Sequence, residues 1–197
     1  MSGPGHNGGP SLEPGAGWRR HCWGAARAAL LPTLPIEVVR SRVRRAAELG
    51  LDYKTYAGVR ATTGRDLVAF LFSSNALGLL REGDRMAPGD ARRIADIAGA
   101  ERLLAAQPPL LPDALIRDLA GQGAEFAAAI PAPGLGDSWS RTGQQLCAFL
   151  AARRHPCDGV LLIGDTALER DWVAAARLAG YLPGDRYFGR RAAPGAG

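Results

Sequence analysis

The sequence lacks the features that mark membrane proteins and disulfide-stabilised secreted proteins. Among its 197 residues, no apolar run approaches the ~20 residues that a membrane-spanning helix needs. Glycine and proline precede any hydrophobic stretch, so the N-terminus shows no signal-peptide pattern. The three cysteines are an odd number without a CxxC pair, which argues against a disulfide framework and against a standard zinc site. We therefore expect a cytoplasmic protein with no membrane partner.

The sequence also lacks the short motifs of common enzyme classes. It contains no GxxxxGK(S/T) phosphate loop, no GxGxxG fingerprint after a predicted strand and no GxSxG nucleophile elbow. Of the three histidines, His6 lies in the glycine-rich start, which leaves His21 and His155 as candidate bases. Cys147 or Cys157 served by His155 is an alternative nucleophile or metal-binding group, but an intervening proline makes direct pairing awkward. We favour a non-catalytic protein and predict no cofactor.

Lysine is nearly absent, because Lys54 is the only one among 24 basic residues. Arginine suits bidentate contacts with phosphate. The codon use of a GC-rich genome produces the same bias, and we favour this explanation and a bacterial source. Residues 1–60 carry nine basic and four acidic side chains, whereas the rest of the chain is close to neutral. The basic excess therefore lies in the N-terminal third.

Composition divides the chain into four predicted parts. Glycine and proline dominate both ends, and such segments are expected to be disordered. Between them, a basic helical segment precedes an α/β domain. The predicted boundaries are 1–17 for the first tail, 18–64 for the helical segment, 65–189 for the α/β domain and 190–197 for the second tail.

Two helices joined by a glycine turn are predicted within the basic segment. The first starts at Pro35 and runs to about Leu49, and the second runs from Tyr53 to about Ala61. The small and apolar residues around Gly50 loosely resemble a helix-turn-helix motif over about 20 residues. In that motif the second helix enters the major groove of DNA, so nucleic acid is a predicted partner.

Six basic residues are the candidates for nucleic-acid binding, namely Arg19, Arg20, Arg40, Arg44, Lys54 and Arg60. Two tryptophans near the first pair suit stacking on bases or anchoring on a partner. Each observation has a simpler alternative. The tryptophans can pin a helix to the core, and the arginines can form a solvated helix surface.

A stretch near the C-terminus predicts a strand followed by a helix. Val160–Ile163 is a short apolar run that ends at a glycine, as in strands covered on both faces. Thr166 and Glu169 have capping-box spacing, so the helix should begin at Ala167. Gly180 is expected to cap its C-terminus.

Other strands and helices follow from hydrophobic runs and periodicity. Strands are predicted at Leu67–Phe72, at 125–130 and at Tyr187-Phe188. Helices are predicted over 91–107, over 112–120 and from Ser138 or Ser140 to Arg153. Strands that alternate with helices favour an α/β fold. The predicted architecture is a small, mainly parallel sheet flanked by helices (Rossmann-like), with a helical N-terminal segment.

Polar residues follow two of the predicted strands. Ser73, Ser74 and Asn75 come after the first, and Asp165 and Glu169 come after the strand near the C-terminus. In open α/β sheets, ligands bind at the carboxyl ends of the strands. We therefore name these five residues as ligand-edge candidates. The alternative is that their side chains cap the turns and the helix that follow.

The same residues carry a local resemblance to a known family. The stretch Gly164-Asp165-x-x-x-Glu169, between a hydrophobic strand and a helix, resembles the fourth motif of haloacid dehalogenase-like phosphohydrolases. The stretch around Ser73 and Ser74 is similar to the second motif of that family. The resemblance implies that Asp165 and Glu169 would hold magnesium, and that Ser73 or Ser74 would contact the phosphoryl group.

The resemblance covers about 25 residues and leaves two functions of the family unassigned. The family's nucleophile is an aspartate in a DxD motif, and the sequence contains no DxD. Its lysine or arginine would have to be replaced by Arg141, Arg153 or Arg154. Without a nucleophile, covalent phosphoryl transfer has no starting group.

Three functions remain open at this point. The preferred prediction is non-catalytic binding of nucleic acid or of a phosphate-bearing ligand through the basic helical segment. The first alternative is a degenerate haloacid dehalogenase-like phosphohydrolase that uses magnesium. The second is a scaffold that binds a protein partner or a second copy of itself.

Overall fold

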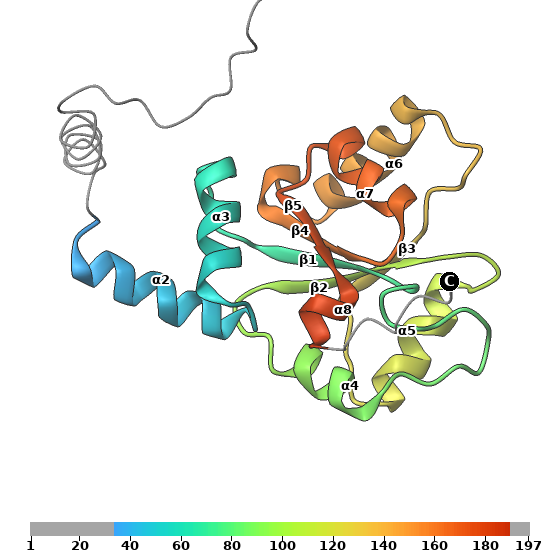
Figure 1. Cartoon of the computed structure of the whole chain (residues 1–197). Helices are drawn as coiled ribbons and strands as arrows, with labels where there is room; N and C mark the ends of the chain where they lie inside the picture. The colour runs from blue at the N-terminus through green and yellow to red at the C-terminus, as the bar shows by residue number, and fades with distance from the viewer. Residues whose placement is uncertain (1–33, 190–197) are drawn as a thin grey trace, which may run out of the picture. The chain divides into compact units, whose positions relative to one another are not determined.

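The computed structural model describes residues 34–189 and contains a five-stranded, all-parallel sheet covered by helices on both faces (Figure 1). This arrangement confirms the predicted α/β, Rossmann-like fold class. The predicted tails at 1–17 and 190–197, and the candidates Arg19 and Arg20, lie outside the described residues.

The first strand in the sequence lies at the centre of the sheet. The strands are β1 (Ala69–Ser73), β2 (Glu101–Ala106), β3 (Ala128–Pro131), β4 (Val160–Gly164) and β5 (Gly180–Pro183), in the order β3-β2-β1-β4-β5. The chain therefore builds outward from β1 to β3 and then returns to place β4 on the other side of β1. The strand order reverses between β1 and β4, and such a switch point is where open α/β sheets bind ligands.

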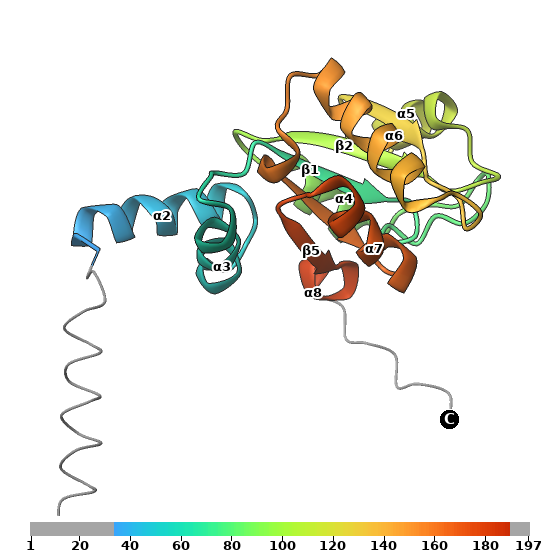
Figure 2. The same ribbon diagram turned by 90° about the horizontal axis from the view of Figure 1, so that it is seen from above.

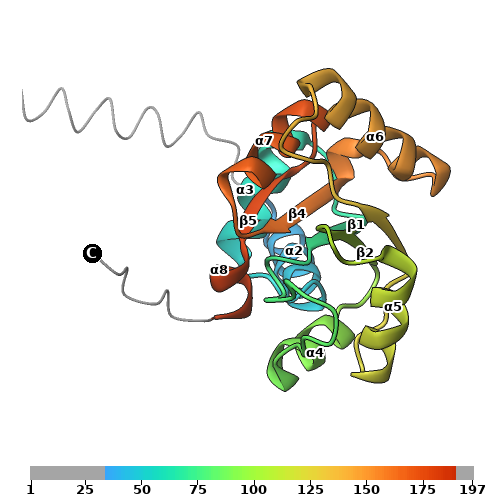
Figure 3. The same ribbon diagram turned by 90° about the vertical axis from the view of Figure 1, so that its right-hand side faces the viewer.

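Helices cover both faces of the sheet (Figures 1 and 3). Helices α4 (Pro88–Ala95), α5 (Pro112–Gly121) and α8 (Gly184–Phe188) pack on one face of the sheet and form a core with every second residue of the central strands. Helices α6 (Trp139–Ala152) and α7 (Ala167–Ala176) form a second core with the alternate strand residues on the other face. Figure 2 shows α6 beside α7. All residues of β1 and β4 are buried, which explains why both strands are continuous apolar runs in the sequence.

The predicted helix pair before the sheet consists of α2 (Ile36–Glu48) and α3 (Tyr53–Thr63). Gly50 takes a positive φ of 65° in the turn, and Asp52 caps α3 by accepting a hydrogen bond from the Thr55 N–H. The described residues from Ser41 onward belong to one compact unit, which contains α3 and the sheet. Leu49 and Tyr56 therefore belong to the same hydrophobic core as the sheet.

Arg45 fastens the end of α2 to the segments that lead into β1 and β2. Its guanidinium donates to the Asp66 carboxylate at 3.0 Å and to the carbonyl oxygens of Leu67, Ala98 and Gly99 at 3.0, 3.2 and 2.9 Å. The planar, five-donor guanidinium suits several acceptors at fixed positions, which an ammonium would not match. The role of Arg45 is therefore structural.

The predicted helix over 91–107 is wrong. Helix α4 ends at Ala95, Gly99 turns the chain with a φ of 69°, and β2 follows. In β2, Leu103 enters the core beneath α6 and α7, and Leu104 enters the opposite core. Leucine and alanine favour helices locally, but pairing with β1 and β3 on both sides overrides that preference.

Two predictions near the C-terminus are also wrong. Helix α7 ends at Ala176 with Arg177 in the left-handed conformation, so Gly180 does not cap the helix but begins β5. Tyr187 and Phe188 lie in α8 and not in an edge strand. Tyr187 packs against Phe70 and Phe72 of β1, and this tertiary contact is invisible in a five-residue window.

Candidate functional site

The carboxyl ends of β1 and β4 bring the ligand-edge candidates to one place at the switch point. Asn75 follows β1, and its side-chain amide donates to Oε1 of Glu169 at 2.9 Å. Glu169 lies in the first turn of α7, directly after β4. The segments that follow β1 and β4 therefore meet at one edge of the sheet.

Glu169 is fully buried, and its carboxylate accepts hydrogen bonds from three segments of the chain. The backbone N–H groups of Asp165 and Thr166 donate to Oε2 at 2.6 and 2.9 Å. Asn75 donates to Oε1, and the Gln107 amide lies at the longer distance of 3.5 Å from the same atom. A carboxylate has about four lone-pair positions, so these donors leave little capacity for a metal ion.

The Thr166 side of this arrangement is the predicted capping box. The Thr166 hydroxyl accepts from the Glu169 N–H at 3.2 Å while Glu169 binds the Thr166 N–H in return. Gly164 permits the close approach, since a Cβ there would lie 2.6 Å from the Tyr181 ring and 3.0 Å from Oε2 of Glu169. The buried charge of Glu169 is thus stabilised by backbone and amide donors.

The two serines of the site bind backbone groups. Both are fully buried. The Ser73 hydroxyl oxygen accepts from the Ala76 N–H at 3.1 Å, and that of Ser74 accepts from the Gln107 N–H at 3.0 Å. The first contact holds the turn after β1, and the second links it to the end of β2. This geometry corresponds to the capping alternative.

Asp165 differs from its neighbours because its side chain is exposed at the sheet edge. Arg141, a possible basic partner, lies on α6 and pairs with Asp137 at 3.1 Å. The structure gives no bond between Arg141 and Asp165. Within residues 34–189, no group of three or more histidine, cysteine, aspartate or glutamate side chains could hold a metal ion.

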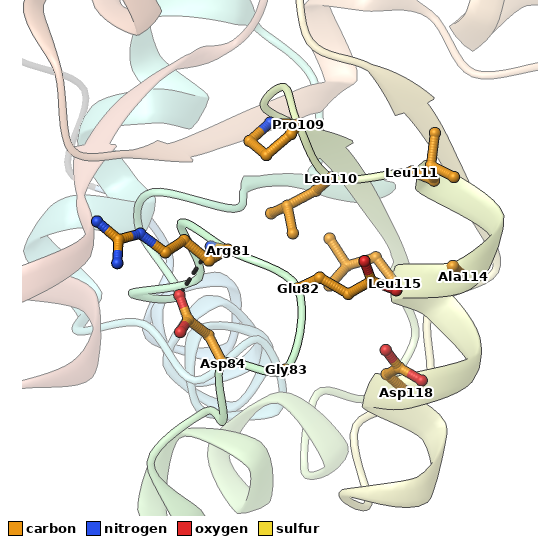
Figure 4. A pocket seen from close by; sticks show the side chains of 10 residues that line it. All are labelled: Arg81, Glu82, Gly83, Asp84, Pro109, Leu110, Leu111, Ala114, Leu115 and Asp118. Atoms are coloured by element: carbon orange, nitrogen blue, oxygen red, sulfur yellow. Dashed lines mark hydrogen bonds between the residues drawn. The ribbon is translucent and has the colours of Figure 1, made fainter.

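A small cavity of about 80 Å³ lies elsewhere on the carboxyl edge (Figure 4). It is formed between the loop after β1, around Arg81 and Asp84, and the segment from Pro109 to Asp118. The Asp84 carboxylate accepts from the Leu80 and Arg81 N–H groups at 2.8 Å, which shapes the first loop. The cavity is smaller than the ~300 Å³ that pockets for drug-sized ligands usually reach. No sequence pattern predicted it, since its walls come from the loop after β1 and from α5 with the segment before it, which are distant in the sequence.

At the opposite end of the sheet, Glu101 binds two basic groups. Arg153 donates to both carboxylate oxygens at 2.7 and 2.8 Å, and Nε2 of His155 lies 2.5 Å from Oε2. The hydrogen bonds from Arg153 are the main cause that lowers the pKa of Glu101 to about 2. His155 is thus engaged by Glu101, and within residues 34–189 it makes no hydrogen bond with Cys147 or Cys157. Arg153 is likewise remote from the switch point.

This cluster predicts a defined pH dependence of stability. Because the pKa of Glu101 is lowered from 4.5 to about 2 in the folded state, its contribution is complete above pH 4.5 and disappears as the pH falls toward 2. We expect Glu101→Gln to lower the free energy of unfolding at pH 7 by about 1–2 kcal/mol, a figure reduced for partial exposure. Urea titrations should show the difference from wild type shrinking between pH 4.5 and pH 2. Glu125→Gln, at an exposed position nearby, is the matched control, and an undiminished difference at pH 2 would contradict the assignment.

The nucleic-acid candidates of the helix pair fall into two groups. Arg40 pairs with Glu37 at 2.8 Å, and Arg60 lies 3.9 Å from Asp66. Arg44 and Lys54 are exposed and have no ion pair among the described residues. Unpaired cations are the ones that remain available to phosphate.

None of the helices within residues 34–189 combines the length and apolar character that crossing a membrane requires. No protein-family model, curated protein or solved structure matches the chain. Its function therefore has to be inferred from its own geometry.

Proposed function

We propose that this protein is a non-catalytic binding protein that holds a phosphate-bearing polymer, such as nucleic acid, through its basic helical segment. The observation that carries the proposal is a pair of exposed cations, Arg44 on α2 and Lys54 on α3, that have no ion pair within residues 34–189. The charge distribution supports it, since the basic excess of the chain lies in residues 1–60. Neutralising phosphates with such cations releases counterions and favours association at low salt.

The switch point supports the non-catalytic part of the proposal. A nucleophile needs a lone pair that faces the substrate, and a metal ligand needs one that faces the ion. The carboxylate of Glu169 and the hydroxyl oxygens of Ser73 and Ser74 instead accept hydrogen bonds from the chain itself. Fully buried side chains with internal partners position loops and do not approach a ligand.

Each of the two alternative functions is supported by one observation. Exposed Asp165 at the switch point is the remaining feature in favour of a magnesium-dependent phosphohydrolase. Exposed apolar side chains favour a protein partner or a second copy, most clearly Leu111 after β2, Leu135 after β3 and Trp139 at the start of α6. Neither observation comes with a second group that would complete a site.

The proposal predicts salt-dependent binding that depends on Arg44 and Lys54. Fluorescence anisotropy with labelled duplex DNA, single-stranded RNA and inorganic polyphosphate should detect binding at low salt. We expect Arg44→Gln/Lys54→Gln to weaken binding at least about tenfold and to reduce the salt slope by up to about 2. The three probes distinguish nucleic acid from other phosphate polymers.

The matched control is Arg85→Gln/Arg92→Gln, which removes the same charge at exposed positions outside the helix pair. It should bind like the wild type. Equal losses in both variants would reduce the effect to net charge, and no binding of any probe at low salt would remove the proposal. Magnesium-dependent hydrolysis of a simple phosphate ester that is lost in Asp165→Ala would favour the phosphohydrolase instead.

A further inference from the structure

Two cysteines from different elements lie side by side on the face of the sheet that α6 and α7 cover. Cys147 belongs to α6, and Cys157 opens the short 3-10 turn η1 (Cys157–Gly159) that leads into β4. Their Sγ atoms are 3.1 Å apart. A disulfide bond needs about 2.05 Å, so an approach of about 1 Å, within reach of side-chain rotation, would join them.

Hydrogen bonds hold the chain in place on both sides of Cys157. His155, between the two cysteines in the sequence, is tied to Glu101 by its ring and to the Leu150 carbonyl by its N–H at 3.0 Å. After Cys157, the Gly159 carbonyl accepts from the Val68 N–H at 2.9 Å, which joins η1 to the start of β1. The proximity of the thiols is therefore a consequence of packing and not of a loose loop.

The environment of the thiols assigns them different roles. Cys157 donates its S–H to the sulfur of Cys147, and Cys147 lies 3.5 Å from the Ala176 carbonyl oxygen. Burial, with the contact to Cys147 second, raises the pKa of the Cys157 thiol to about 12. Because the thiolate is the attacking form of a cysteine, the raised pKa of Cys157 leaves Cys147 as the group that reacts first. Both residues are partly exposed, which lets a small reagent reach them.

We propose that Cys147 and Cys157 form a reversible intramolecular disulfide when the protein meets a low-molecular-weight disulfide. The Cys147 thiolate attacks one sulfur of the small disulfide and expels its other half as a thiol, which leaves a mixed disulfide. Cys157 then loses its proton, attacks the Cys147 sulfur and releases the second small thiol. The protein loses two protons and two electrons, and the small disulfide gains them.

The bond fastens the second half of α6 to the turn that precedes β4. It closes a short loop around Arg153 and His155, the two residues that bind Glu101. Such a ring restricts the unfolded chain more than the folded one, whose sulfurs are already adjacent. Oxidation is therefore a stabilising modification that is undone by reduction.

The test uses the full chain incubated with oxidised glutathione. Trypsin cleaves after Arg153 and Arg154, so Cys147 and Cys157 fall on different peptides that stay together only through the disulfide. We expect a linked peptide pair, a mass lower by about 2 Da than the reduced chain, and a melting temperature higher by about 5 °C. Dithiothreitol should reverse all three changes.

Matched variants distinguish this pair from other chemistry. Cys22→Ser removes the third cysteine and should behave like the wild type. Cys147→Ser and Cys157→Ser should abolish the linked peptides and the thermal shift. A linkage that involves Cys22 or a second chain, or stable glutathione adducts on both Cys147 and Cys157 of the folded protein, would overturn the proposal.

Discussion

Replacing Glu169 with alanine is expected to lower the free energy of unfolding by about 3–5 kcal/mol. The substitution removes a buried carboxylate and leaves the N–H groups of Asp165 and Thr166, together with the Asn75 amide, without their acceptor. Each orphaned buried donor carries a desolvation penalty of about 1–3 kcal/mol. Loss of the capping box at the start of α7 adds to the effect.

Urea unfolding monitored by tryptophan fluorescence measures this loss as a lower midpoint with an unchanged slope. Glu169→Gln should destabilise the protein less than Glu169→Ala, because the glutamine amide keeps one acceptor oxygen. It should still be less stable than the wild type, because the NH2 group replaces the other acceptor and faces a hydrogen-bond donor. Asp165→Ala is the matched control at an adjacent, exposed position and should change stability by less than about 0.5 kcal/mol. If Glu169→Ala were as mild as Asp165→Ala, the carboxylate would not be the structural centre of this edge.

Gly143→Ala in α6 is expected to destabilise the protein by about 1–3 kcal/mol, against the usual preference of helices for alanine. A Cβ at this position would lie 2.4 Å from the Ala175 carbonyl oxygen of α7, and the obstacle is backbone. The two helices would have to separate, which loosens the core around Trp172 and Leu146. Thermal unfolding should show a melting temperature lower by several degrees.

Gly58→Ala provides the contrast, because Gly58 lies inside α3 and a Cβ there would meet nothing within 4 Å. This variant should be stabilised by about 0.5–1 kcal/mol, as helix propensity predicts. Opposite signs at two helical glycines would establish that close approach of α6 and α7 requires Gly143. A stabilised Gly143→Ala would mean that the two helices have room to spare.

Several elements were predictable because their signals are local. The β4 strand and the start of α7 combine an apolar run with a capping box, and both were predicted within a residue. Helix α6 begins after Ser138, one of the two serines, Ser138 and Ser140, that the sequence offers as its start. In each case the hydrogen bond or the periodicity that defines the element is contained within a few neighbouring residues, so no distant contact is needed to recognise it.

Strand β2 could not be predicted from its local sequence. Residues 101–106 are compatible with a helix or a buried strand, and only the parallel pairing with β1 and β3 selects the strand. In the same way, Gly180 is both a plausible helix cap and the first residue of β5. Where local preferences are nearly balanced, the burial and hydrogen bonds available from distant parts of the chain decide the outcome.

In the candidate site, too, some features follow from the local sequence and others depend on contacts between distant parts of the chain. Local pattern placed Ser73, Ser74 and Asn75 at one strand end and Asp165 and Glu169 at another, and the rule for parallel sheets brought the two ends together. The pattern does not contain the hydrogen bond between Asn75 and Glu169, which are 94 residues apart, and this bond determines that the buried carboxylate serves the fold. The adjacency of Cys147 and Cys157 also depends on how α6 packs on the sheet. Residue types and strand ends are properties of the sequence, whereas the partner that each polar group finds is decided by tertiary packing.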